Sequence, residues 1–214
     1  MKEIAVIIPF KAARRKSRLL GTLNPGQREK LSLLMLESVL AAVAGAGLAR
    51  TCHVVTSDEP ALELARRAGG APVAEKENSG VNAAVSLGMR RVGARRYLIL
   101  PADLPLLTAS DIERAVALTS LSADVVISPS RHLDGTNLLL FSGDRRVPLS
   151  YDRNSFWDHI SSAARMGCSL AVYTGKGALF DVDTPDDLEV LAGLQISNRT
   201  VSFARKVLGQ RESS

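Results

Sequence analysis

The chain has 214 residues, of which 46% are hydrophobic and 4% aromatic, with 27 Lys and Arg against 22 Asp and Glu. That length suffices for one domain with an aliphatic core, and no linker or low-complexity tract divides it, so we expect a single domain over residues 1–214 with a C-terminal tail from about residue 198. The formal charge of +5 favours anionic partners, either nucleotide phosphates or nucleic acid, and no apolar run is long enough to span a membrane.

The N-terminus and the cysteines indicate a reducing compartment. The first apolar run has Glu3 ahead of it and no small-residue cleavage site after it, which is typical of a first strand and not of a signal peptide. Cys52 and Cys168 are far apart and form no CxxC pair, so we expect reduced thiols. The sequence therefore predicts a cytoplasmic protein.

A strongly basic loop follows the first predicted strand, residues 4–9. Five cations fall within the eight residues from Lys11 to Arg18, among them Lys16. Like charges this close repel one another unless an anion neutralises them, and the carboxyl end of a buried strand is where α/β sheets bind ligands. We expect the loop to bind a polyphosphate, although it is not a P-loop; the alternative is a solvated basic loop.

The next segments alternate as βαβ units do. We expect a helix over about 27–44, a strand over 52–56, a helix over about 60–68 and a short strand near 72–74. Asn82 then begins or caps a helix over 83–92, and its amide suits either a cap or a ligand contact.

Two acidic strand ends form the centre of the predicted site. Residues 97–100 are an apolar strand buried on both faces, which Pro101 ends and Asp103 follows. A second strand end, over 179–183, carries Asp181 and Asp183 directly before a helix start. Carboxylates at one sheet edge could share a hard cation, whereas each acid taken singly could be a cap or turn former.

The alternation is interrupted between these two ends. We expect a helix to about residue 120 and a strand over 124–129. Residues 136–141 are then predicted to form a strand of a small mixed or antiparallel insertion, with Thr136 at the edge that lines a pocket. A polar loop leads into a helix over 156–166, where first-turn amides could hold an anion, or where Asn154 or Ser155 could simply cap the helix. We expect a further strand over 169–173, a helix from residue 185 with Asp186 and Asp187 in structural roles, and no zinc site, because the three His are isolated.

The basic loop and the acidic strand ends together suit nucleotidyl transfer. The cations would bind a triphosphate, and the carboxylates would hold Mg²⁺ to neutralise charge that develops on the phosphates. No protein nucleophile is required.

Short motifs in order along nearly the whole chain support this reading: PFK at 9–11, KSRL at 16–19, LPADLPLLT at 100–108, GTN at 135–137, NSF at 154–156 and DVDTPDDL at 181–188. They resemble the 2-phospho-L-lactate guanylyltransferase family of coenzyme F(420) biosynthesis, whose relatives include MobA-like nucleotidyltransferases. The resemblance implies a single-domain, Rossmann-like, three-layer α/β fold of glycosyltransferase-A type, with a mostly parallel sheet and a small mixed or antiparallel insertion. It also implies a Mg²⁺-dependent reaction of GTP with 2-phospho-L-lactate that gives lactyl-2-diphospho-5'-guanosine and pyrophosphate.

The resemblance assigns roles residue by residue. The implied metal ligands are Asp103, Asp181 and Asp183, and the implied triphosphate contacts are Lys11, Lys16 and Arg18. Of these, Lys16 and Asp103 are implied to be catalytic. The resemblance also places Asn82 near the nucleoside, and it places Thr136, Asp152 and Ser155 around the acceptor acid. The family commonly has glycine where this chain has Asp152, which puts the geometry of that contact in question.

Several alternatives stay open at the level of sequence. The acceptor could be phosphoenolpyruvate or 3-phosphoglycerate instead of phospholactate, and a molybdopterin or sugar-phosphate nucleotidyltransferase would share the fold. A nucleic-acid-binding module is the competing class, but aromatic residues for stacking are scarce and no nucleic-acid motif is present. We expect GTP and a small phosphorylated acid as partners, no nucleic acid and no membrane; a homodimer is compatible with the sequence.

Overall fold

The structure is a computed structural model that describes residues 2–11, 17–76, 80–121 and 123–210. Its strands form one sheet in the order β3-β2-β1-β4-β6-β5-β7. Strand β6 is antiparallel to both of its neighbours, β4 and β5, and all other neighbours are parallel. The strands are β1 (Lys2–Pro9), β2 (Cys52–Thr56), β3 (Ala71–Ala74), β4 (Ala94–Ile99), β5 (Val125–Pro129), β6 (Thr136–Ser142) and β7 (Leu170–Val172).

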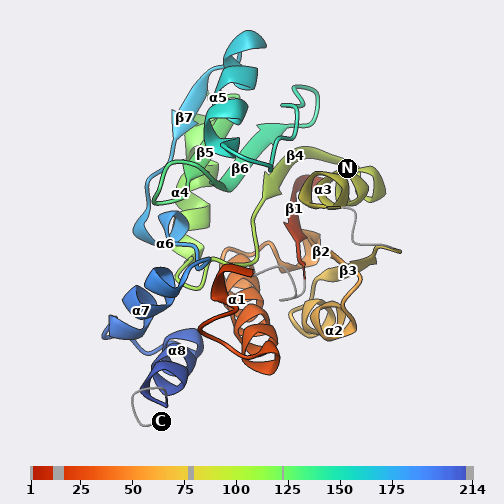
Figure 1. Cartoon of the computed structure of the whole chain (residues 1–214). Helices are drawn as coiled ribbons and strands as arrows, with labels where there is room; N and C mark the ends of the chain where they lie inside the picture. Colours follow the sequence, from red (N-terminus) through yellow and green to blue (C-terminus); the bar gives the residue numbers. More distant parts are fainter. Residues whose placement is uncertain (1, 12–16, 77–79, 122, 211–214) are drawn as a thin grey trace.

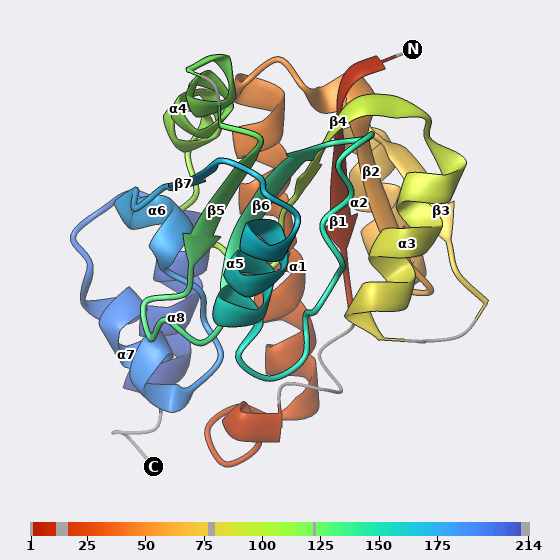
Figure 2. The ribbon, with the colours of Figure 1, turned by 90° about the horizontal axis from the view of Figure 1, so that it is seen from above.

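Helices cover both faces of this sheet (Figures 1 and 2). One face packs against α1, α2 and α4, and the other packs against α3 and α5. A third apolar cluster joins α1 to α7 and α8. The helices are α1 (Pro25–Gly45), α2 (Glu59–Arg67), α3 (Val81–Arg91), α4 (Ala109–Ser120), α5 (Ser155–Arg165), α6 (Lys176–Leu179), α7 (Pro185–Gly193) and α8 (Arg199–Gly209). The architecture is the expected three-layer α/β domain.

Strand β1 shows why helices are needed on both sides. Val6 and Ile8 point into one core cluster, while Ala5 and Ile7 point into the other, and all four are fully buried. Successive residues of a strand face opposite ways, so an apolar run of this kind must be covered twice. Helix α3 approaches β1 closely because Gly88 has no side chain, and a Cβ there would lie 2.9 Å from Ile7 Cγ2.

Most predicted elements are confirmed, with ends displaced by at most three residues; the largest displacement is the start of β4, at Ala94 instead of residue 97. The insertion predicted at 136–141 is the antiparallel strand β6, and the tail contains helix α8. Thr108 and Thr184 each cap a helix in a capping box, with Asp111 and Asp187 as the reciprocal partners. The structural role predicted for Asp187 is therefore confirmed.

The strand end predicted over 179–183 is wrong. Residues Lys176–Leu179 form the short helix α6, and no described strand contains residues 180–184. Gly177 allows this turn of helix to lie against the chain at Leu106, since a Cβ at position 177 would clash with the Leu106 carbonyl oxygen. The following residues attach to the sheet edge by a main-chain contact to Asp103 instead of by strand pairing.

None of the described helices combines the length and the hydropathy that a bilayer span requires.

Candidate active site

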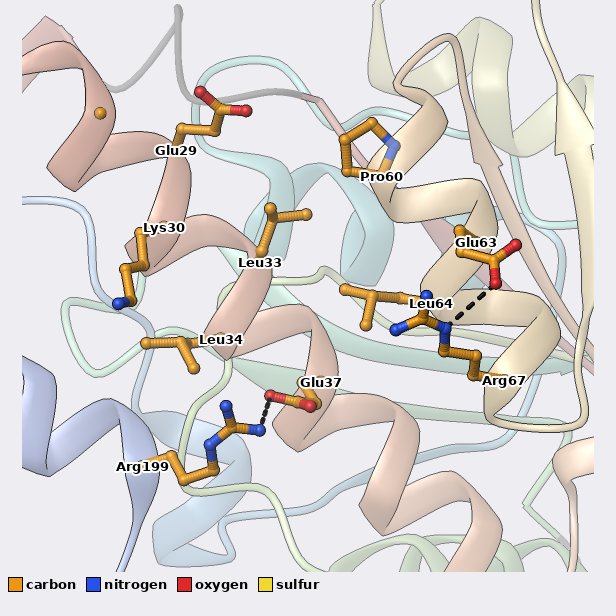
Figure 3. Close-up of a pocket in the computed structure, with 11 residues that line it drawn as sticks. Glu29, Lys30, Leu33, Leu34, Glu37, Pro60, Glu63, Leu64, Arg67 and Arg199 are labelled. Atoms are coloured by element: carbon orange, nitrogen blue, oxygen red, sulfur yellow. Dashed lines mark hydrogen bonds and ion pairs between the residues drawn. The ribbon is translucent and has the colours of Figure 1, made fainter.

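A cleft of about 270 Å³ lies at the carboxyl ends of β1 and β4. Its walls are mainly apolar, and two acids and a cation reach it: the lining includes Pro9, Phe10, Val81, Tyr151, Lys11, Asp103 and Asp183. Open α/β sheets bind ligands at this edge. A larger cavity of about 460 Å³ lies between α1 and α2 (Figure 3), but its charged groups include the ion pairs Arg67–Glu63 and Arg199–Glu37. The smaller cleft is therefore the better candidate.

The structure brings the predicted carboxylates Asp103, Asp181 and Asp183 together, although no strand carries the last two. The Val182 main-chain N–H donates to the Asp103 carbonyl oxygen at 3.2 Å, which fixes the 181–183 segment beside Asp103. Burial raises the pKa of Asp181 to about 6, and the negative charge of Asp103 acts in the same direction, followed by that of Asp183. A hydrogen bond of 3.2 Å from the Asn137 amide opposes the rise.

This cluster has the chemistry of a site for a hard cation. Crowded, partly buried carboxylates favour the protonated form unless a cation neutralises them. Within the described ranges, no three His, Cys, Asp or Glu side chains are placed to hold a metal ion by themselves. Mg²⁺, however, commonly takes one or two carboxylates and completes its shell with phosphate oxygens and water. Asp103 with one of its two neighbours fits that requirement.

Lys11, which was predicted to contact a triphosphate, lines the cleft. Its ammonium forms an ion pair with Glu75 Oε1, and both side chains are largely buried. Glu75 directly follows β3, and its N–H donates to the Thr56 carbonyl oxygen at 3.1 Å. Lys11 thus already has an anionic partner at the cleft.

The structure gives little geometry for the other two predicted phosphate contacts, Lys16 and Arg18. Lys16 lies outside the described residues. Arg18 belongs to a single turn of 3-10 helix, Ser17–Leu19, and it is exposed.

Thr136 and Ser155, predicted to bind the acceptor, do lie side by side. The Ser155 hydroxyl donates to Thr136 Oγ1 at 3.2 Å, and His159 Nδ1 lies 3.0 Å from the same oxygen. The other ring nitrogen of His159 accepts from the Ser150 main-chain N–H at 3.0 Å, so Nδ1 carries the proton of the neutral ring. Burial lowers the pKa of His159 to about 4. The network therefore joins β6, α5 and the loop before α5.

Asn82 contacts the same loop and is not a helix cap. Gly80 occupies the cap position of α3 with φ 93°, a conformation that favours glycine, so Asn82 falls inside the first turn. Its Oδ1 accepts from the Tyr151 N–H at 2.8 Å, and its Nδ2 donates to Asp152 Oδ2 at 3.3 Å. Asn82 thus ties the start of α3 to residues 151 and 152.

Asp152 fits its position without backbone strain. Among the described non-glycine residues, positive φ angles occur at Leu133 and Asn154, not at Asp152. The Asp152 side chain is exposed and bonded to Asn82, so the departure from glycine does not require a left-handed backbone. Asn154 is the N-cap residue of α5, but its side chain makes no cap hydrogen bond.

Sequence reasoning missed Glu75 and His159 as parts of the site. Glu75 follows a predicted strand directly, a signal like that of Asp103, but it precedes several other polar residues. His159 lies far in sequence from the residues it contacts, and helical periodicity alone could not pair it with Thr136.

The described geometry is that of a three-layer α/β domain with acids at the carboxyl edge of its sheet, and solved structures share the fold. A structure from Desulfovibrio desulfuricans G20 superposes with a TM-score of 0.74 at 17% identity and covers 98% of both chains. A nucleotidyl transferase from a Methanothermobacter species gives a TM-score of 0.64 at 17% identity, over 96% of this chain and 100% of that one. The fold is that of nucleotidyltransferases.

The chain belongs to the family described as "Guanylyl transferase CofC like", which it matches over residues 4–208. It is 38% identical to the phosphoenolpyruvate guanylyltransferase of Rubrobacter xylanophilus, over 92% of this chain and 98% of that protein. It is also 29% identical to the 2-phospho-L-lactate guanylyltransferase of Methanocaldococcus jannaschii, over 88% of this chain and 80% of that protein. The family resemblance predicted from the motifs is confirmed.

Proposed function

We propose that this protein transfers GMP from GTP to the phosphate of a small phosphorylated three-carbon acid, releasing pyrophosphate. An acceptor phosphate oxygen attacks the α-phosphorus of GTP, and the bond from that phosphorus to the bridging oxygen of the β-phosphate breaks. The observation that carries the proposal is the cluster of Asp103, Asp181 and Asp183 at the ligand edge, in a chain of the guanylyl transferase family.

The proposed nucleotide site runs from Lys11 to the carboxylates. Lys16 and Arg18 would bind the triphosphate, and Asn82 would support the nucleoside through the loop at Tyr151. Asp103 with Asp181 or Asp183 would hold Mg²⁺, which supplies charge neutralisation at the α-phosphate and the leaving pyrophosphate. The chain's own contribution is to fix these carboxylates by the Val182 to Asp103 hydrogen bond and by Asn137.

The proposed acceptor site lies at Thr136, Ser155 and the main chain of Asp152. Ser155 begins helix α5, and free amides at a helix N-terminus favour an anion such as a carboxylate. The hydroxyls of Thr136 and Ser155 are buried and hydrogen-bonded to each other, which keeps them fixed in position. Holding the carboxylate there would leave the acceptor phosphate free to attack in line.

Phosphoenolpyruvate and 2-phospho-L-lactate are the proposed acceptors. The sequence motifs favour phospholactate, whereas the relatives named for phosphoenolpyruvate are more similar to this chain, at 38% and 34% identity against 29% and 30%. Either product would be a guanylyl diphosphate diester suited to coenzyme F(420) biosynthesis, the role that the motifs imply.

Pyrophosphate release tests the proposal. The purified protein is incubated with GTP, Mg²⁺ and, separately, phosphoenolpyruvate, 2-phospho-L-lactate, 3-phosphoglycerate or no acceptor. Release that requires one of the first two acids supports the proposal. Release that is independent of every acceptor rejects it, and release only with 3-phosphoglycerate rejects phosphoenolpyruvate and 2-phospho-L-lactate as the acceptors.

A further inference from the structure

One buried group beside the cleft, the Glu75 carboxylate, has no role in the reaction proposed above. Glu75 is 8% exposed, and its Oε1 is paired with Lys11, which lines the cleft. Its second oxygen, Oε2, is buried and has no hydrogen-bond partner among the residues that the structure describes. A buried carboxylate oxygen without a donor is destabilising and rare in native proteins, so it calls for a donor supplied by something that binds there.

The strand order places this pair on one side of the proposed nucleotide site. Glu75 follows β3 and Lys11 follows β1, whereas Asp103 follows β4 on the opposite side of β1. The proposed acceptor site at Thr136 of β6 lies on the other side of β4, so a nucleotide with its phosphates at Asp103 would have its base toward the β3 side. The apolar walls at Pro9, Phe10 and Val81 suit the flat faces of a base.

We propose that Glu75 and Lys11 read the Watson–Crick edge of guanine and thereby select GTP, an inference that rests on the guanylyl transfer proposed above. That edge presents two adjacent donors, N1–H and the 2-amino group, beside the acceptor O6. The carboxylate of Glu75 can accept hydrogen bonds from the two donors, and the ammonium of Lys11 can donate a hydrogen bond to O6. Adenine would instead turn its N1 lone pair toward the carboxylate.

The alternative is that Glu75 only neutralises Lys11. The two roles differ in what they predict for inosine triphosphate, which keeps O6 and N1–H but lacks the 2-amino group. A guanine-reading carboxylate loses one charged hydrogen bond with this analogue, whereas a carboxylate that only neutralises Lys11 loses nothing.

The experiment is calorimetric binding of GTP, inosine triphosphate and ATP with Mg²⁺ and no acceptor. The wild type should bind GTP about tenfold or more tightly than inosine triphosphate, and ATP more weakly still. Glu75→Gln should reduce the ratio of GTP to inosine triphosphate affinity to roughly twofold, because an amide offers one acceptor in place of two. Lys11→Gln should weaken both nucleotides alike and leave the ratio unchanged, since both carry O6.

Glu3→Gln is the matched control. Glu3 forms an ion pair of 2.8 Å with Arg96 near the start of β1, at the far end of the strand that leads to Lys11. This variant should keep the wild-type affinities and ratio.

Two results would overturn the inference: equal affinity of the wild type for GTP and inosine triphosphate, or a full GTP preference in folded Glu75→Gln. The first needs no variant, so the proposal can be overturned even if Glu75→Gln does not fold. If either result is obtained while pyrophosphate release from GTP still depends on the acceptor, only the role of Glu75 is rejected, and the proposed guanylyl transfer is unaffected.

Discussion

The main-chain N–H of Val182 donates a hydrogen bond to the carbonyl oxygen of Asp103 at 3.2 Å. This single contact joins two segments that are almost eighty residues apart in sequence, and Asp181 and Asp183 flank the residue that makes it. Because the contact is between main-chain atoms, substitution of the acids should leave it in place. Variants of these side chains can therefore test chemistry separately from the local fold.

Asp103→Asn keeps the shape of the side chain but removes its charge. We expect kcat to fall by about 10²- to 10³-fold, as for the loss of a major electrostatic group at a reacting centre. Steady-state kinetics at saturating Mg²⁺ and GTP measure this. The control is Asp186→Asn, an exposed acid in the first turn of α7, which should keep wild-type turnover. Near-normal turnover of Asp103→Asn would remove Asp103 from the proposed metal site.

Lys16→Ala tests the predicted triphosphate contact. The KM for GTP should rise by about tenfold, the effect expected from one lost charged hydrogen bond, with little change in the KM for the acceptor. Lys206→Ala, on the exposed side of α8, serves as the control for removal of a surface cation. Equal effects of the two substitutions would show that the loop attracts GTP only through general positive charge.

Thr136→Val replaces a hydroxyl by a methyl group of similar size. We expect the KM of the acceptor acid to rise by about tenfold while the KM of GTP stays within about twofold, because Thr136 lies at the proposed acceptor site. Thr51→Val is the control: it removes a hydroxyl bonded to Leu48 just before β2, at the amino end of that strand and away from the carboxyl ends that form the cleft. A matching rise in both Michaelis constants for Thr136→Val would place the acceptor elsewhere.

His159 should make stability depend on pH. Its folded-state pKa of about 4 lies below the ordinary value near 6.5, so the unfolded chain binds the proton more readily. The resulting stability is fully present above pH 6.5 and is lost as the pH falls toward 4, by up to about 3 kcal/mol. Thermal unfolding midpoints measured between pH 4 and 7 should fall more steeply in the wild type than in His159→Gln.

The matched control for that titration is His132→Gln, since the His132 side chain is exposed. This variant should follow the wild-type curve. If His159→Gln loses stability on acidification as steeply as the wild type, other groups dominate the dependence.

Local patterns were sufficient to predict most of the fold. The apolar run at residues 97–100 and the helix start at residue 185 are properties of neighbouring residues, and the structure has a buried strand and a helix there, although β4 begins three residues earlier. The motif around Asp181 correctly predicted that this segment lies near Asp103, but it wrongly predicted a strand there. The close approach that Gly177 permits depends on Leu106, which is distant in sequence.

Long-range polar partners were beyond the reach of sequence patterns. Lys11 and Glu75 are 64 residues apart, and Thr136 and His159 are 23 apart, so neither pair shares a helix face or a hairpin. Only the strand order places the ends of β1 and β3 on either side of β2, and only tertiary packing brings His159 of α5 to Thr136 of β6. The sequence could predict that the positive charge of Lys11 lies at a ligand site, but it could not predict that Glu75 is its partner.

Phosphorus NMR of one reaction mixture tests the central claim most directly. The wild type is incubated with GTP, Mg²⁺ and either phosphoenolpyruvate or 2-phospho-L-lactate, and Asp103→Asn is treated in parallel. The account predicts that the acceptor's phosphate monoester signal is replaced by a pair of coupled diphosphate signals, with one pyrophosphate formed for each, and that Asp103→Asn forms neither at a comparable rate. Pyrophosphate accompanied by free GMP and an unchanged acceptor signal would contradict it.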